Sequence, residues 1–185
     1  MPKVVNEEME RANILDAFEK CALEVPFNKI TVRDIGKKAG ISHSKIFSYF
    51  DSKNEIITSY ANRVAELYAK SFEEFVEKNL DLIGTKSRFV EKIVEELFEI
   101  DPDNKFEKIY IQIYVLGQYD PEIRKLVLRA YKSWRDALKK SLHKLTDVGD
   151  REVCSLLVLI EGIMIYRMND DLSKEDASHI VHDLL

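Results

Sequence analysis

Apolar residues recur every three or four positions along most of the chain, which is the spacing of one face of an α-helix. This pattern predicts helices over residues 7–24, 53–79, 87–100, 106–116, 121–145 and 151–168, with a short capped helix after Ser173. Residues 106–116 hold the β-branched and aromatic run IYIQIYVL, but no second candidate strand could pair with it. Helix is the better interpretation there too, so we expect an all-α fold.

Residues 31–50, TVRDIGKKAGISHSKIFSYF, differ from the long helices in having several start and stop signals close together. Thr31 and Asp34 fit a capping box at the start of one short helix. Gly40 can take the left-handed conformation that ends a helix, and Ser42 can cap the next one. The stretch therefore predicts two short helices joined by a tight turn, which is a helix-turn-helix.

The second short helix has an apolar face and a polar face. Ile46, Tyr49 and Phe50 have inward spacing, and Gly36 in the first helix costs about 1 kcal/mol relative to Ala, which suggests that the second helix crosses it closely. Hydroxyl and ammonium groups suit base edges and phosphates, although a merely solvated face fits these residues equally well. The outward residues are His43, Ser44, Lys45, Phe47 and Ser48.

The segment that follows favours DNA over a solvated face. Ser52 and Glu55 have the spacing of a full capping box, and Lys53 projects at a helix N-terminus, where phosphate already binds well. The chain is acidic overall, with a net charge of −5, yet residues 29–53 carry a net charge of +4 and the remainder −9. A basic region, here called the basic island, on an otherwise acidic chain is typical of a DNA-binding protein with a separate regulatory domain. The alternative is chance clustering of the charges.

Residues 8–68 resemble the DNA-binding domain of the TetR family of bacterial and archaeal transcription regulators, through the motif TVRDIGKKAGISHSKIFSYFDSKNEI. The chain has Pro26-Phe27 where the family commonly has Gly-Phe, Ser44 for Gly, Lys45 for Thr or Ser, and Phe47 for Tyr. The resemblance implies that Thr31, Arg33, Lys45, position 47 and Lys53 hold the DNA backbone, while His43, Ser44 and Ser48 are best placed to read bases. The predicted DNA-binding set is Thr31, Arg33, Ser42, His43, Ser44, Lys45, Phe47, Ser48, Tyr49 and Lys53.

We expect a second domain, residues 69–185, that is helical and regulatory. The helix over 53–79 would be about 40 Å long at 1.5 Å per residue, enough to act as a rigid lever between the two domains. The helix over 151–168 is apolar on nearly every side from Val153 to Tyr166, so it should be buried all round. Either the chain's own core encloses it, or a second copy covers it in a four-helix interface of a homodimer. The predicted interface residues are Leu138, Leu142, Leu156, Leu159, Ile160 and Ile163.

Aromatic residues are frequent in the second domain. Their helical spacing fits plain core, while the TetR resemblance implies a small-molecule cavity there. The candidate lining residues are Tyr68, Phe72, Phe89, Phe98, Tyr110, Tyr114, Tyr131 and Trp134. The isolated polar groups that could orient a ligand are Gln112, Arg129, His143 and Glu161.

Other functions lack the residue patterns that they need. The four histidines lie on different segments, and the sequence contains no HExxH, no shaped Ser/His/Asp set and no Gly-rich phosphate loop, so we expect no enzyme, metal or cofactor. The amino terminus has no apolar signal segment, and no apolar run reaches membrane-spanning length. We interpret Cys21 and Cys154 as free cysteines that fill buried apolar positions, and we expect a cytoplasmic protein in a reducing compartment.

The hypothesis is a homodimeric repressor that binds a pseudo-palindromic site in double-stranded operator DNA and is released by a small, largely apolar effector. A helical protein-interaction adaptor and a DNA-binding chromosome-organisation factor are the alternatives.

Overall fold

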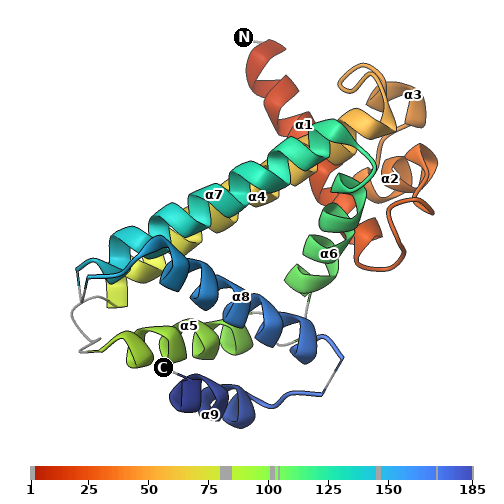
Figure 1. The fold of residues 1–185 in the computed structure, drawn as a ribbon. Coiled ribbons are helices and arrows are strands. Elements are labelled where there is room, and N and C mark those ends of the chain that lie inside the picture. The colour runs from red at the N-terminus through yellow and green to blue at the C-terminus, as the bar shows by residue number, and fades with distance from the viewer. Residues whose placement is uncertain are drawn as a thin grey trace. The chain divides into compact units, whose positions relative to one another are not determined.

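A computed structural model describes residues 3–79, 85–100, 103, 105–144, 147–169 and 171–184. Every regular element in these ranges is a helix, which confirms the expected all-α fold (Figure 1). The helices are α1 (Lys3–Ala22), α2 (Val32–Ala39), α3 (His43–Ile46), α4 (Lys53–Asn79), α5 (Lys86–Ile100), α6 (Lys105–Gly117), α7 (Pro121–Leu142), α8 (Asp150–Arg167) and α9 (Lys174–Leu184).

The helix bounds follow the capping signals closely. α4 spans the predicted residues, whereas α7 ends at Leu142 and not near Leu145. Asp120 Oδ1 accepts hydrogen bonds from the backbone N–H groups of Glu122 and Ile123 (2.9 and 3.2 Å), so it caps α7. The predicted break at Asp101-Pro102 and most of the break at 81–86 lie outside the described residues.

The cap of α4 differs from the predicted capping box. Ser52 Oγ accepts a hydrogen bond from the backbone N–H of Glu55 (3.1 Å), as expected. Glu55 Oε2, however, accepts a hydrogen bond from the backbone N–H of Asp51 (2.6 Å), one residue before the expected donor. Glu55 therefore ties the segment before the cap to the first turn of α4.

The helices form two compact units. The first unit contains Met1–Ala65 and Ile111–Val127, and the second contains Glu66–Tyr110 and Leu128–Leu185. The unit boundaries fall inside α4, α6 and α7, so each of these helices contributes residues to both units. The sequence prediction divided the chain at residue 68 alone and assigned residues 111–127 to the second domain.

The core of the first unit is centred on Phe18 of α1. Its ring meets the rings of Phe27 and Tyr60 edge-on, with centroids 5.0 and 5.2 Å apart. Phe27 and Ile30 are buried in the segment between α1 and α2. Val25 is exposed, since α1 ends at Ala22. Other buried residues around this core are Ile14, Ile35, Ile46, Phe50, Ile56 and Ile57.

In the second unit, α5 packs against α8 and α9 (Figure 1). The core between these helices includes Phe89, Val94, Leu156, Ala177 and Val181. A charged pair also lies inside, since Arg167 of α8 donates to the Glu107 carboxylate and to the Leu97 carbonyl while its guanidinium lies 4.9 Å from the Phe98 ring centroid. Leu67 of α4 is exposed.

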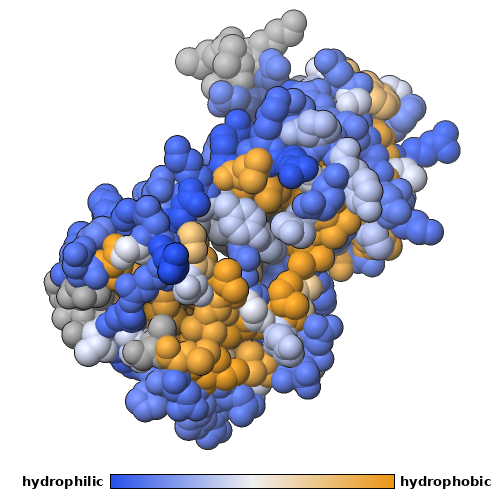
Figure 2. All heavy atoms as spheres, viewed as in Figure 1, coloured by the Kyte–Doolittle hydropathy of each residue, from blue (hydrophilic) through white to orange (hydrophobic). Residues whose placement is uncertain are grey.

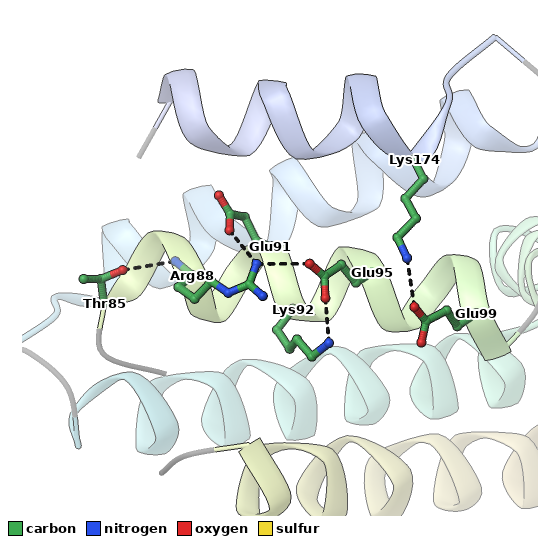
Figure 3. Close-up of polar contacts among 7 residues, drawn as sticks. All are labelled: Thr85, Arg88, Glu91, Lys92, Glu95, Glu99 and Lys174. Carbon is green, nitrogen blue, oxygen red and sulfur yellow. Dashed lines mark hydrogen bonds and ion pairs between the residues drawn. The ribbon is translucent and has the colours of Figure 1, made fainter. Parts of the chain in front are cut away.

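Ion pairs cover the outer face of α5 (Figure 3). Arg88 Nη1 lies 3.0 Å from both Glu91 Oε2 and Glu95 Oε1, and Lys92 Nζ lies 2.6 Å from Glu95 Oε2. Lys174 Nζ is 2.8 Å from Glu99 Oε1 and so connects α9 to α5. Exposed pairs of this kind contribute at most about 1 kcal/mol each, so the apolar core dominates the stability of this unit.

Candidate nucleic-acid interface

The turn between α2 and α3 has the predicted geometry. Gly40 adopts the left-handed conformation with φ of 71°, and its N–H bonds to the carbonyl of Gly36. The N–H of Ile41 bonds to the same carbonyl at 3.0 Å. These bonds end α2 and reverse the chain at once, which places α3 against α2.

Gly36 is required at this turn for steric reasons. A Cβ atom added there would lie 2.8 Å from the carbonyl oxygen of Ile41 and 3.5 Å from the backbone nitrogen of His43. The expected close approach is therefore confirmed. Its nearest partner is the backbone of the turn and not a side chain of a crossing helix.

The regular part of α3 is short, but its hydrogen bonding continues beyond Ile46. The backbone N–H groups of Ser48 and Tyr49 bond to carbonyls three residues earlier, at 3.1 and 2.9 Å, and that of Phe50 bonds to Ile46 at 3.0 Å. Ile46 and Phe50 are buried, and Tyr49 is half-buried. The predicted outward residues are all exposed: His43, Ser44, Lys45, Phe47 and Ser48.

Two hydroxyl groups of the predicted DNA-binding set serve as helix caps. Thr31 Oγ1 accepts a hydrogen bond from the backbone N–H of Asp34 (3.2 Å) and donates to Asp34 Oδ2 (2.6 Å). That second bond and one from the Thr31 N–H to Oδ2 (2.9 Å) lower the pKa of the Asp34 carboxyl. Ser42 Oγ accepts from the backbone N–H of Lys45 (3.2 Å). Both hydroxyls thus position the helices, whatever else they contact.

The remaining members of the predicted DNA-binding set differ from one another in exposure and contacts. Arg33 is exposed, whereas Lys53 is half-buried and burial lowers its pKa. The ring of Phe47 lies edge-on to that of His43, with centroids 5.8 Å apart, and Ser44 Oγ lies 3.4 Å from His43 Nδ1. The structure therefore gathers His43, Ser44 and Phe47 into one exposed cluster.

Arg11 of α1 holds the end of this motif, and the sequence offered no sign of it. Arg11 Nη1 donates a hydrogen bond to the carbonyl of Tyr49, and Nη2 lies 3.0 Å from Glu55 Oε1. The guanidinium also lies 4.0 Å from the ring centroid of Phe50. One side chain thus connects the segment after α3 to the start of α4. Local periodicity contains no signal for such a contact.

Acids on the first helix and just after it neutralise part of the basic island. Lys45 Nζ lies 2.7 Å from Glu10 Oε1, and Lys38 Nζ lies 2.6 Å from Glu24 Oε1. In each pair, the hydrogen bond to the glutamate raises the pKa of the lysine. The net charge of residues 29–53 therefore overstates the positive potential that the first unit presents.

The predicted ligand-lining residues do not form one group. Phe89 lies in the core of the second unit, Tyr114 is exposed and belongs to the first unit, and the side chain of Tyr68 lies outside the described residues. Phe72 and Phe98 pack against the core. The remaining three, Tyr110, Tyr131 and Trp134, lie together.

The four polar residues suggested as ligand partners do not lie together either. Gln112 Oε1 accepts a hydrogen bond from the Phe27 N–H (2.8 Å) and its Nε2 donates to the Ala22 carbonyl (3.2 Å), so Gln112 connects α6 to the segment after α1 in the first unit. Arg129 and His143 are exposed. Only Glu161 lies with the three clustered aromatic residues, through hydrogen bonds to tyrosine hydroxyls.

Five of the six predicted interface residues are buried within their own chain: Leu138, Leu142, Leu156, Ile160 and Ile163. Leu159 is half-buried and packs against the same core. Val158, Ile165 and Tyr166 of α8 are exposed, so the chain's own core does not enclose this helix on every side. Of the two alternatives, enclosure by a second copy therefore stays a prediction.

The two cysteines differ. Cys21 is buried, and burial raises the pKa of its thiol, whereas Cys154 is exposed on α8, so its prediction as a buried filler is wrong. Within the described ranges, no three His, Cys, Asp or Glu side chains come together in a way that could hold a metal ion. No helix in those ranges is long and apolar enough to cross a membrane.

Capped helices joined by a left-handed glycine turn, with a polar face exposed on the second helix, define a helix-turn-helix DNA-binding protein. Comparison with known proteins shows what this part of the chain is similar to. Residues 14–60 match the family model for bacterial regulatory proteins of the tetR family. The chain is 23% identical to the HTH-type transcriptional regulator PksA of Bacillus subtilis (strain 168), over 92% of this chain and 84% of that protein. Residues 14–60, which hold the helix-turn-helix, thus match the DNA-binding domain of TetR-family regulators, and nearly the whole chain is similar to one transcriptional regulator.

Solved structures show the same fold over nearly the whole chain. A TetR-family regulator from Mesorhizobium loti MAFF303099 superposes with a TM-score of 0.79 at 14% identity, covering 99% of this chain and 95% of that one. A transcriptional regulator from Saccharomonospora viridis, solved in complex with choline, has a TM-score of 0.78 at 20% identity, with 95% of each chain covered. At these identities the likeness concerns the fold alone.

Proposed function

We propose that this regulator is a homodimeric, cytoplasmic repressor that binds a pseudo-palindromic operator and is released from it by a small molecule. The observation that carries the proposal is the exposed face of α3 and the residues after it, which Arg11 holds in place from α1. The contacts of Arg11 limit the motion of α3 and of the residues after it. Recognition of base edges requires side chains that are held in a fixed position.

The DNA contacts are assigned by chemistry and exposure. Arg33, Lys45 and Lys53 are the cationic groups for phosphates, with Thr31 and Phe47 beside them. His43, Ser44 and Ser48 are exposed on α3 or immediately after it and are the candidates for base contacts. Ser42 and Tyr49 complete the interface, Ser42 as a cap and Tyr49 through its half-buried ring.

The homodimer is supported by the exposed face of α8. Val158, Ile165 and Tyr166 recur at helical spacing on that face with 70%, 42% and 59% of their surface exposed. Figure 2 shows apolar side chains gathered along α8 in the second unit. A large exposed apolar patch on one helix favours an interface, and a two-fold axis would let the same face cover itself. Two subunits would then present two copies of α3 to sites about 34–36 Å apart.

Release by a small molecule is supported by the second unit and by one relative. The half-buried residues Tyr110, Tyr131 and Trp134 are candidates to contact the effector. The Saccharomonospora viridis regulator with this fold was solved with choline. Because α4 contributes residues to both units, an effector that favours one position of this helix would change operator affinity.

Fluorescence anisotropy with genomic fragments selected by the protein tests the DNA-binding part of the proposal. Arg33 and Lys53 give four phosphate contacts per dimer, and Lys45, for which Glu10 competes, adds up to two more, so log K should fall against log salt with a slope between about −4 and −5. A slope near zero would contradict DNA binding and favour a helical adaptor. Selection of many sites across the genome, instead of a few promoters, would favour chromosome organisation over local repression.

Calorimetry tests the effector part. An effector that releases the protein must bind more weakly when operator is present, because coupling between the two sites is reciprocal. Equal affinities with and without operator would contradict the release mechanism and leave DNA binding intact.

A further inference from the structure

Three aromatic side chains and one acid meet inside the second unit, contributed by three helices. Tyr110 of α6 and Tyr131 and Trp134 of α7 lie together, with ring centroids 5.8 Å apart for Tyr110 and Trp134 and 5.7 Å for Tyr131 and Trp134. The hydroxyl groups of Tyr110 and Tyr131 share a hydrogen bond. Both also hydrogen-bond to the side chain of Glu161 of α8. We call these four residues the Glu161 cluster.

Glu161 differs from Glu107 in the partners of its carboxyl group. Glu107, the other acid inside this unit, is paired with Arg167, whereas no ion pair joins Glu161 to a basic residue in the part of the chain that the structure describes. Its Oε1 atom is buried and has no hydrogen-bond partner there. A buried carboxylate oxygen without a partner is costly, and a hydrogen bond from a bound ligand would remove that cost.

The environment of Glu161 disfavours its charged form. Burial raises the pKa of the Glu161 carboxyl, and the hydrogen bonds with Tyr131 and Tyr110 act in the opposite direction. A cation bound beside the carboxyl would favour its ionised form.

The Glu161 cluster is not sealed from solvent. All four side chains are half-buried, in contrast to Glu107 and Arg167, which are almost fully buried. Aromatic faces within about 6 Å of a cation attract it. The two tyrosines hydrogen-bond to the acid, and the Trp134 ring packs against both of them. The group combines an anion, an unfilled acceptor and aromatic faces at a place that retains some exposure.

We propose that the Glu161 cluster binds the protonated amine of an effector that also carries an apolar group. The ammonium N–H donates a hydrogen bond to Glu161 Oε1, and the rings of Tyr110, Tyr131 and Trp134 contact the cation and its apolar substituents. This inference rests on the proposed effector-responsive function and gives the chemical class of the effector. It narrows the sequence expectation of a largely apolar molecule by adding one cationic N–H group.

Isothermal titration of the full chain without DNA tests the inference with matched probes. N,N-dimethylbenzylammonium carries charge and an N–H, benzyltrimethylammonium carries charge only, and isobutylbenzene is the neutral isostere of the first. We expect N,N-dimethylbenzylammonium to bind at least about tenfold more tightly than isobutylbenzene, and the affinity of benzyltrimethylammonium to lie between the two. Equal binding of all three probes, or no binding of any, would overturn the inference.

The variant Glu161→Gln keeps the shape of the side chain and removes its negative charge. It should abolish the preference for N,N-dimethylbenzylammonium over isobutylbenzene, whereas Glu175→Gln, at an exposed position of α9, should retain it. If Glu161→Gln does not fold, Trp134→Leu leaves the acid in place and should reduce the preference several-fold. A preference unchanged in both variants would overturn the proposal.

Operator binding is measured separately on the same samples. Amine binding that depends on Glu161 but leaves operator affinity unchanged supports the site and contradicts release by this effector. Operator binding with no amine preference contradicts the site alone. The two hypotheses therefore fail in different measurements.

Discussion

Lys45 on α3 forms an ion pair with Glu10 on α1, with 2.7 Å between Nζ and Oε1. The pair is exposed, so it contributes little to stability. Its consequence concerns DNA, because a phosphate must compete with Glu10 for the same ammonium group. Glu10 thus limits the contribution of the cation that replaces the common Thr or Ser at position 45.

Replacing Glu10 with Gln should increase DNA affinity. The freed Lys45 ammonium can neutralise one further phosphate per subunit, which should make the salt slope steeper by about 1 per subunit and raise affinity for all sequences alike. Anisotropy titrations across a salt series measure both quantities. Glu24→Gln, which removes the corresponding partner of Lys38, is the matched control away from α3. An unchanged slope would mean that Lys45 does not contact phosphate. Lys45→Ala should then change the preference among sequences, as expected of a residue that reads bases.

Replacing Gly36 with Ala should destabilise the first unit by about 1–3 kcal/mol, because the new methyl group would clash with the backbone at Ile41. Thermal unfolding followed by circular dichroism measures the effect. Gly162→Ala is the control, since a Cβ there meets no atom within 4 Å and alanine favours helix. Equal stability of the two variants would show that the turn yields to the extra atom.

Replacing Gln112 with Leu should also lower stability. The change leaves the buried N–H of Phe27 and the carbonyl of Ala22 without their hydrogen bonds, at a cost of about 1–3 kcal/mol. Urea unfolding provides the measurement. The same substitution at the exposed Gln118 of the turn after α6 should cost far less. A loss no greater at Gln112 than at Gln118 would contradict the tie between α6 and the first unit.

The dimer prediction is tested at Val158. An aspartate there would place a charge in the proposed α8 interface, and Val158→Asp should sediment as a 21.5 kDa species at micromolar concentration while wild type sediments as a dimer. Val115→Asp, at an exposed valine of α6, should remain dimeric. The exposed thiol of Cys154 on α8 should react faster with maleimide in the monomeric variant. Wild type that sediments as a monomer would remove the homodimer from the proposal.

Acid should weaken the first unit through Glu55. Hydrogen bonds from the Asp51 N–H and then from Arg11 lower the pKa of Glu55 below its ordinary value of 4.5. The stability that ionised Glu55 contributes to the first unit is therefore complete above pH 4.5, and it is lost as the pH falls through the lowered pKa of Glu55. Unfolding free energies measured from pH 7 to pH 3 should fall less steeply for Glu55→Gln than for wild type. Glu73→Gln, at an exposed site of α4, should follow the wild-type curve.

Much of this fold could be predicted because its signals are local. The start of α4 follows from Ser52 and Glu55, that of α7 from Asp120, and the reversal after α2 from Gly40. Each depends on hydrogen bonds between residues at most five apart in the chain. Such bonds form in almost any context that allows a helix, so the residue types suffice to place them.

The faces of the helices in the second unit were harder to predict. α8 is apolar on nearly all sides, and a pattern without a polar face cannot say which residues face the core. Ile160 and Ile163 proved to be buried within the chain and Val158 exposed. The error over Cys154 has the same origin, since the exposure of a residue on such a helix depends on which neighbouring helices cover it.

The sequence by itself determined that the protein is helical, where most of its helices begin and end, and that residues 31–50 form a helix-turn-helix. Only the tertiary structure decided which side chains hold and modify that motif. Arg11 reaches Tyr49, Glu10 reaches Lys45, and Glu161 meets Tyr110 and Tyr131 across gaps of 30 or more residues. These contacts depend on how the helices pack and not on spacing along the chain. The intervals that specify each helix therefore carry no information about them.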